Sequence, residues 1–263
     1  MKLKKIKFLL IASALLLAFG CNKEENPSED ISFEEFTVKG VSFKMIKVDG
    51  GTFTMGETPE QVEDAEHNER PAHQVTLSDY YIGQYEVTQE LWEIVMGSNP
   101  SSNQSNPKNP VESVTWNVVV YDFLPKLNKL TGQTFTLPTE AQWEFAARGG
   151  NKSKGYKYSG SNNLDEVAWY RDNSNDQTHP GGQKLPNELG IYDMSGHVWE
   201  WCNDWYGDYS AEAQTNPTGP ASGASRVLRG GSCIIYASRC RVSNRIDYSP
   251  GYGGFGFRLA LAL

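Results

Sequence analysis

The sequence has few cysteines, few histidines and few basic residues. Of its 263 residues only 4 are cysteine and 4 are histidine, and the histidines are not at metal-ligand spacing. This excludes a disulfide-dense scaffold and a non-haem iron enzyme that needs a histidine cluster. No segment repeats at a fixed period, which excludes repeat folds. Lys and Arg number 24 against 32 Asp and Glu. We expect no nucleic-acid partner, because an acidic surface repels phosphate backbones.

Turn-forming residues are abundant, with 25 Gly and 13 Pro. This argues against a helical bundle. Short strand patterns, few helix patterns and long loops from residue 38 to residue 263 predict a single α+β domain with little regular secondary structure. Long loops inside one domain usually have a function or are held by ions or disulfides.

The N-terminus has the pattern of an export signal. Lys2, Lys4, Lys5 and Lys7 precede the apolar run 8–19, which is too short to span a bilayer comfortably. Gly20 and Cys21 then resemble a lipoprotein cleavage site. We interpret residues 1–20 as a lipoprotein signal peptide, with Cys21 as the lipidated first mature residue. The alternative is ordinary cleavage near Gly20 that leaves Cys21 as a free thiol.

Residues 21–37 are polar and acidic, so we interpret them as a flexible tether. Lys23, Glu24 and Glu25 resemble the surface-export signal of some Gram-negative lipoproteins. The predicted location is therefore the outer membrane, exposed at the surface, with a lipid on Cys21 as the membrane anchor.

Local patterns predict several elements of the domain. Alternating residues 41–45 and 52–55 flank the turn 49–51 and predict a hairpin, and 75–87 is expected to hold a second strand pair. Residues 58–70 are charged and are expected to form a surface loop.

Three helices are predicted from their capping residues. Thr88 precedes a helix over 89–96, and Thr139 with Gln142 forms a capping box for a helix over 140–148. The segment 115–130 has an apolar stripe, but Pro125 should kink or split it.

Several motifs together resemble the formylglycine-generating (sulfatase-modifying factor) family. The resemblance covers nearly the whole mature domain and implies a fold distantly like that of C-type lectins. In chain order the motifs are 50–56 (GGTFTMG), 85–88 (YEVT), 137–150 (LPTEAQWEFAARGG), 190–202 (GIYDMSGHVWEWC), 226–232 (RVLRGGS) and 256–260 (GFRLA).

Enzymes of this family oxidise a cysteine of an unfolded sulfatase segment to formylglycine, using oxygen and copper(I). The resemblance places their two copper-binding cysteines three and eight residues after Ser232. Cys240 matches the second position, but Ile235 occupies the first and has no metal-binding chemistry. Cys233 could substitute only if the loop were rebuilt, because a shift of two residues moves the sulfur by about 6–7 Å. Ser232, Cys233 and Cys240 are therefore catalytic candidates only under an oxidase reading.

The cysteines have a structural reading as well. Exported thiols tend to pair, and the resemblance places Cys202 near Cys240, so that bridge is favoured. Cys233–Cys240 is the other possibility, and the sequence alone does not choose firmly between them.

The resemblance also implies a structural calcium ion. The side chains of Asp193 and Glu200 and the carbonyls of Gly196 and Val198 match the family's ligands, and hard oxygen donors suit calcium. Asp193 stands where the family has asparagine.

Two functions follow from these observations. The favoured one is a catalytically silent surface lipoprotein that binds glycan or protein, since the aromatic- and glycine-rich loops 156–163 and 248–255 suit recognition. The resemblance places Trp199 near the substrate groove. The alternative is a copper-dependent formylglycine-generating oxidase acting on sulfatase cysteines.

Overall fold

The computed structural model describes residues 31–251 and 253–263. The predicted signal peptide, the lipidation at Cys21 and most of the predicted tether lie outside the described residues. Strand β1 (Phe33–Val38) begins before the predicted end of the tether at residue 37, so the folded domain starts earlier than predicted. Most of its side chains are exposed and backbone pairing holds it, which is why its sequence resembles a tether. None of the helices in the described part is long and apolar enough to cross a membrane.

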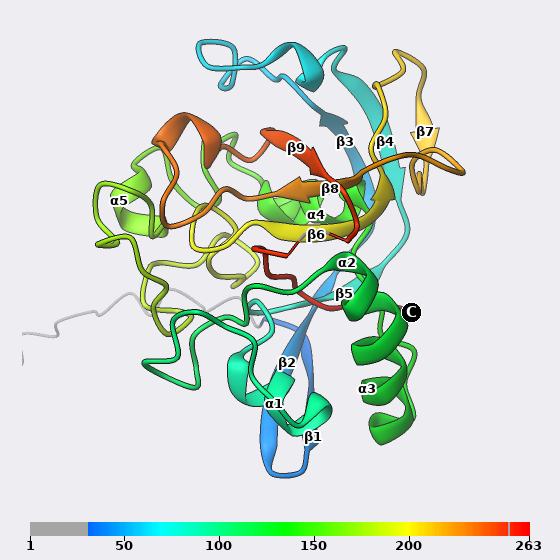
Figure 1. The fold of residues 1–263 in the computed structure, drawn as a ribbon. Coiled ribbons are helices and arrows are strands. Elements are labelled where there is room, and N and C mark those ends of the chain that lie inside the picture. Colours follow the sequence, from blue (N-terminus) through cyan, green and yellow to red (C-terminus); the bar gives the residue numbers. More distant parts are fainter. Residues whose placement is uncertain (1–30, 252) are drawn as a thin grey trace, which may run out of the picture. The chain divides into compact units, whose positions relative to one another are not determined.

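The other elements are short and separated by long loops (Figure 1). The remaining strands are β2 (Val41–Val48), β3 (Gly51–Met55), β4 (His73–Leu77), β5 (Tyr80–Gly83), β6 (Glu200–Trp205), β7 (Gln214–Thr215), β8 (Arg226–Arg229), β9 (Arg245–Tyr248) and β10 (Ala260–Ala262). The helices are η1 (His67–Glu69), α1 (Gln89–Met96), α2 (Trp116–Val118), η2 (Val119–Phe123), α3 (Leu124–Thr131), α4 (Glu140–Ala147), η3 (Gly150–Lys152), α5 (Leu164–Val167) and η4 (Ala237–Arg239).

The strands form three small sheets, ordered β1-β2-β5-β10, β3-β4-β7 and β6-β8-β9. The predicted hairpin between 41–45 and 52–55 is wrong, because β2 pairs with β1 and β5 whereas β3 pairs with β4. The predicted strand pair within 75–87 is also wrong, since β4 and β5 belong to different sheets. Gly50 marks the point where the chain passes between sheets. A Cβ there would lie 2.3 Å from the Leu77 carbonyl oxygen, a close approach that only glycine permits.

Two predicted helices are confirmed by their caps. The Thr88 hydroxyl accepts from the Leu91 amide at the start of α1, and Gly97 ends it in the left-handed conformation. At α4 the Thr139 hydroxyl accepts from the Gln142 amide at 3.2 Å, and the Gln142 side chain accepts from the Thr139 amide at 2.9 Å. This is the predicted capping box.

The predicted helix over 115–130 is divided into α2, the π-helical turn η2 and α3. Pro125 lies in the first turn of α3. It has no amide hydrogen to donate to a carbonyl one turn earlier, and the chain accommodates this with the wider turn that precedes it.

The capping box gives a direct stability test. Thr139→Ala should lower the free energy of unfolding by about 1 kcal/mol, because the Gln142 amide at the start of a largely buried helix loses its acceptor. Thr134→Ala, at an exposed loop position, is the control. Denaturant unfolding of both variants measures the difference, and equal midpoints would show that the cap contributes nothing.

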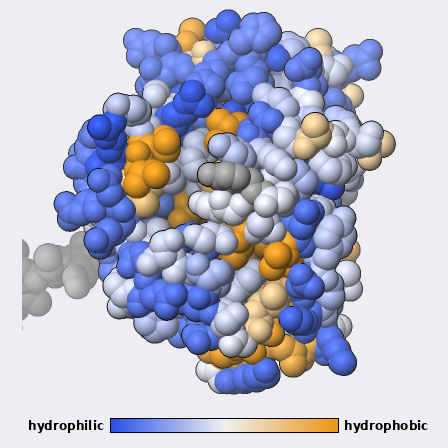
Figure 2. All heavy atoms as spheres, in the orientation of Figure 1, coloured by the Kyte–Doolittle hydropathy of each residue, from blue (hydrophilic) through white to orange (hydrophobic). Residues whose placement is uncertain are grey.

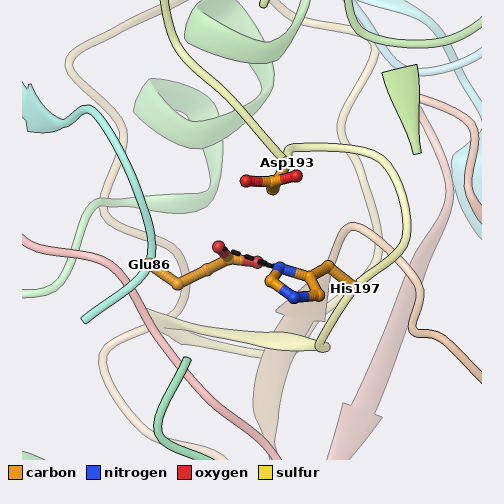
Figure 3. A group of neighbouring side chains, drawn as sticks. All are labelled: Glu86, Asp193 and His197. Carbon is orange, nitrogen blue, oxygen red and sulfur yellow. Dashed lines mark hydrogen bonds and ion pairs between the residues drawn. The ribbon is translucent and has the colours of Figure 1, made fainter. Parts of the chain in front are cut away.

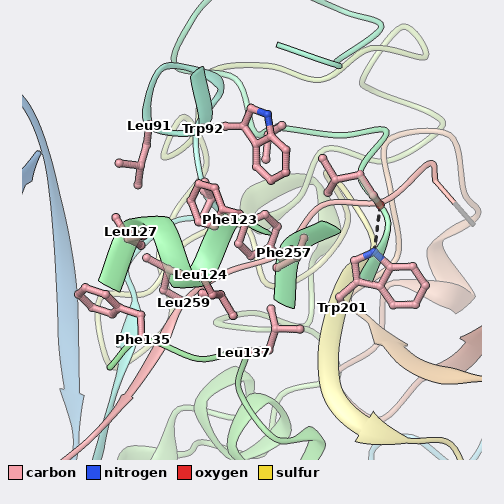
Figure 4. Close-up of a cluster of buried hydrophobic side chains, with 14 of the residues drawn as sticks. Leu91, Trp92, Phe123, Leu124, Leu127, Phe135, Leu137, Trp201, Phe257 and Leu259 are labelled. Carbon is pink, nitrogen blue, oxygen red and sulfur yellow. Dashed lines mark hydrogen bonds between the residues drawn. The ribbon is translucent and has the colours of Figure 1, made fainter. Parts of the chain in front are cut away.

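Two hydrophobic cores hold the sheets and helices together. The first packs the β1-β2-β5-β10 sheet against α1, η2 and α3. In it the Trp92 ring stacks on Phe123 with centroids 4.9 Å apart, and Phe257 meets both rings edge-on (Figure 4). The second core surrounds α4, whose Trp143 and Phe145 are almost completely buried.

Buried arginine–carboxylate pairs connect segments that are far apart in the sequence. Each arginine is at most 1% exposed, and each pairs with a carboxylate at least 58 positions earlier in the chain. Because charges are buried only when they are paired, these pairs replace regular structure as anchors for the loops. The pairs are Arg229–Glu144, Arg241–Glu69, Arg245–Glu140 and Arg258–Glu200.

This network changes the interpretation of residues 58–70. They were expected to form a charged surface loop, but Gln61 and Glu69 have no solvent exposure. Glu69 receives two hydrogen bonds from Arg241, at 2.6 and 2.8 Å, so the segment is anchored to the interior.

Candidate functional site

A cavity of about 760 Å³ opens between loops of the domain. Its walls come from residues 102–103, 112, 176–178, 197–199, 232–236, 239, 246, 248 and 254–255. We call this cavity the loop groove. In the face shown in Figure 2, apolar side chains gather in small groups among hydrophilic ones, without a broad apolar surface.

The loop groove has apolar walls with a few charged groups. Val198, Trp199, Ile234, Ile235 and Phe255 are among its apolar lining residues. Ile234 is 57% exposed although it is aliphatic, which makes it available to a ligand. The charged lining residues are Glu112, Asp176 and Arg239. A groove of this composition suits a ligand that is mainly apolar and carries a few polar groups.

Trp199 lines the loop groove and is held there by the C-terminal motif. Its carbonyl accepts from the Gly256 amide at 2.8 Å. A Cβ on Gly256 would lie 2.7 Å from the Val111 carbonyl and 2.8 Å from the Val198 side chain, so glycine allows this close approach.

The predicted disulfides do not form. Cys202, Cys233 and Cys240 are all free and buried. Cys202 packs in the second core and Cys240 in a separate small cluster with Tyr158 and Leu164, so the favoured bridge would join two different cores. The side chains of Cys202 and Cys240 therefore pack in different hydrophobic clusters, although the resemblance places their segments near each other.

The free thiols can be counted. Denatured without reductant, the protein should react with a thiol reagent at Cys202, Cys233 and Cys240, as mapped by peptide mass spectrometry. In the native state the reaction should be slow, because burial raises the pKa of Cys233 to about 11 and of Cys240 to about 12. Unmodified Cys202 and Cys240 after denaturation would restore the predicted bridge.

The candidate copper residues are not presented equally to the loop groove. Cys233 and Ser232 line the groove beside Ile235. Cys240 has no exposure, and none of its atoms belongs to the groove wall. The thiol in the family position is therefore buried behind the wall, and isoleucine occupies the other position.

Glu200 does not fit the predicted calcium role. Its two oxygens receive hydrogen bonds from Arg258 at 2.6 and 2.7 Å, and one also accepts from the Trp143 indole at 2.8 Å. A calcium ion bound to Glu200 would face this guanidinium at close range. Without Glu200, Asp193 would be the one carboxylate left beside two carbonyls, and water would have to supply the remaining oxygens that calcium takes.

His197 lies between the loop groove and a buried carboxylate. Its Nδ1 is 3.1 Å from Glu86 Oε1, and both side chains are almost fully buried. Burial raises the pKa of Glu86 to about 7, and although burial opposes the charged imidazole, Glu86 raises the pKa of His197 to about 9. No local pattern in the sequence indicates this contact, because 111 positions separate the two residues, although Glu86 lies in the motif 85–88 and His197 in the motif 190–202.

Short strands, short helices and long loops that enclose a groove define an α+β domain of the formylglycine-generating-enzyme fold. The chain belongs to the family described as the sulfatase-modifying factor enzyme 1-like domain, which it matches over residues 29–263.

The similar proteins include a formylglycine-generating enzyme, a protein named as a chaperone and a variable protein. The chain is 34% identical to the chaperone protein LppX of Paenibacillus barcinonensis, over 91% of each chain. It is 37% identical to the formylglycine-generating enzyme of Streptomyces coelicolor, over 59% of this chain and 53% of that one. Among solved structures, Treponema denticola variable protein 1 has a TM-score of 0.79 and 34% identity, covering 88% of this chain and 99% of that chain. PvdO from Pseudomonas aeruginosa has a TM-score of 0.73 and 26% identity, covering 88% and 98%.

Proposed function

We propose that this protein is a non-catalytic surface lipoprotein that binds an extended segment of a partner protein in the loop groove. The observation that carries the proposal is the groove itself, with aliphatic and aromatic walls and Ile235 in the copper-ligand position. Isoleucine walls favour apolar side chains of a polypeptide over sugars, which need polar partners for their hydroxyl groups. The charges of Glu112, Asp176 and Arg239 would pair with polar groups of such a segment.

The name of one relative supports this choice. One similar protein of matching length is named a chaperone, and handling of unfolded chains requires a groove that accepts apolar segments. The proposed anchor at Cys21 would place this groove at the outer membrane surface.

Binding can be measured with a defined unfolded chain. Fluorescence anisotropy of a labelled, reduced and carboxymethylated polypeptide should show saturable binding, whereas the same polypeptide in its folded state should not bind. Oligosaccharides in excess should not compete. Binding of oligosaccharides in place of the unfolded chain would overturn the proposal in favour of a glycan-binding protein.

The oxidase alternative has its own test. We expect no aldehyde by mass spectrometry when a Cys-x-Pro-x-Arg peptide is incubated with the copper-loaded protein and oxygen, because two thiolates are needed at fixed separation and position 235 is isoleucine. Ile235→Cys, alone and with Cys233→Trp, restores the family spacing. Aldehyde formed by the unaltered protein and abolished by Cys240→Ser would show that the protein is an oxidase.

A further inference from the structure

Three potential metal ligands from distant segments meet at one buried point. Glu86 lies just before α1, and Asp193 and His197 lie in the loop before β6 (Figure 3). One ligand atom from each side chain lies within 4.8 Å of the other two. Among the described residues, this is the group of three potential metal ligands that lie close enough together to hold one ion. Their exposures are 3%, 2% and 0%.

Asp193 has an unsatisfied oxygen in this group. Its Oδ2 accepts from the Gly182 amide at 2.7 Å, but its Oδ1 is buried and has no hydrogen-bond partner. Buried carboxylate oxygens without partners are costly, so each calls for an explanation such as a bound ion.

The group carries a surplus of negative charge when all of its carboxylates are ionised. Arg258 is close enough to interact with both Glu86 and Asp193, but its guanidinium is held by both oxygens of Glu200. These side chains comprise three carboxylates and one guanidinium, so with His197 protonated one negative charge remains, and either a proton on Glu86, whose pKa burial raises to about 7, or a bound cation neutralises it. A divalent ion beside a neutral His197 would balance the set.

The surroundings of His197 are compatible with metal ligation. Its Nε2 is 2.9 Å from the His179 carbonyl oxygen and 3.2 Å from the His179 amide nitrogen. When Nε2 donates to the carbonyl, the shorter contact, Nδ1 presents its lone pair toward the Glu86 carboxylate, 3.1 and 3.2 Å away. Metal-bound histidines commonly donate their other ring N–H to a backbone carbonyl in this way.

We propose that Glu86, Asp193 and His197 bind a divalent first-row transition ion, such as Zn²⁺, behind the wall of the loop groove. One imidazole and two carboxylates suit such an ion, whereas calcium prefers oxygen ligands alone. This site shares Asp193 with the predicted calcium site, but it uses Glu86 and His197 in place of Glu200 and the two carbonyls. The bound ion would fix the segment that carries Trp199. The proposed metal site does not depend on which ligand the loop groove binds.

The test is metal binding by the full-length protein, purified without a metal-affinity tag, treated with chelator and desalted. Calorimetry with Zn²⁺, and elemental analysis after gel filtration, should give one equivalent per chain, with far weaker binding of Ca²⁺. Asp193→Asn and His197→Asn should each weaken Zn²⁺ binding at least about tenfold, since each removes one ligand. His67→Asn, at an exposed histidine, should not.

A Cys233→Ser/Cys240→Ser variant separates this site from the thiols and should bind Zn²⁺ normally. The proposal is overturned if the folded, unaltered protein takes up no Zn²⁺ at micromolar concentration, or if binding disappears in the cysteine variant and persists in His197→Asn. Asp193→Asn keeps the side-chain shape and remains informative if His197→Asn does not fold.

Discussion

Replacing Arg258 by methionine is expected to lower the free energy of unfolding by about 3–5 kcal/mol, the usual effect of removing one partner of a buried ion pair. Arg258 is fully buried and binds both oxygens of Glu200. It also donates to the carbonyls of Gly83 and Tyr192, at 3.0 and 3.1 Å. The variant leaves Glu200 as an uncompensated buried charge and removes the donor to the carbonyls of Gly83 and Tyr192.

Denaturant unfolding measures this effect, and Lys157→Met is the matched control. Lys157 pairs with Asp64 at 2.6 Å, but both side chains are partly exposed, so its loss should matter far less. Adding Glu200→Gln to Arg258→Met should restore part of the lost stability, because the unpaired charge is removed. Equal effects of Arg258→Met and Lys157→Met would show that the buried pair is not an anchor of the fold.

Introducing a charge into the loop groove should weaken polypeptide binding strongly. Ile234→Asp is expected to raise the dissociation constant at least about tenfold, equivalent to 1.4 kcal/mol, because it places a carboxylate where the ligand's apolar side chains would pack. Ile234 is 57% exposed, so the folded state should tolerate the change.

Leu185→Asp is the matched control for this prediction. Leu185 is 59% exposed and does not belong to the groove wall. Anisotropy titrations of the labelled, carboxymethylated polypeptide should separate the two variants. If both variants bind as tightly as the unaltered protein, the groove is not the binding surface.

Local patterns in the sequence predicted the structural features that neighbouring residues determine, such as helix starts and helix breaks. Thr88 and Thr139 begin helices where their capping patterns placed them, and Pro125 interrupts the helical segment. The hairpin prediction failed because alternation identifies strands but does not say which strands pair. Gly50 is a crossing between two sheets and resembles a hairpin turn in sequence.

Most of the missed features depend on contacts between residues that are distant in the sequence. In the sequence Glu69 has the surroundings of a surface acid, but in the structure it pairs with Arg241, which lies 172 positions later. The Cys202–Cys240 bridge failed because the motif resemblance brings segments together without fixing the direction of each side chain. The contact of Glu86 with His197 had no local signal. Strand β1 is the exception, because its partner β2 follows it directly in the sequence, and its exposed acidic side chains have the composition of a tether.

The central claim, that the loop groove holds a polypeptide segment, is tested most directly by crosslinking from a residue in its wall. Tyr236 lines the groove and is 63% exposed, and Tyr121, outside the wall, is 67% exposed. Each can be replaced in turn by the photoreactive benzoylphenylalanine, and the protein irradiated with the carboxymethylated polypeptide. We predict a crosslinked product from position 236 and little or none from position 121. Equal products from both positions, or a product from position 121 alone, would contradict binding in the groove.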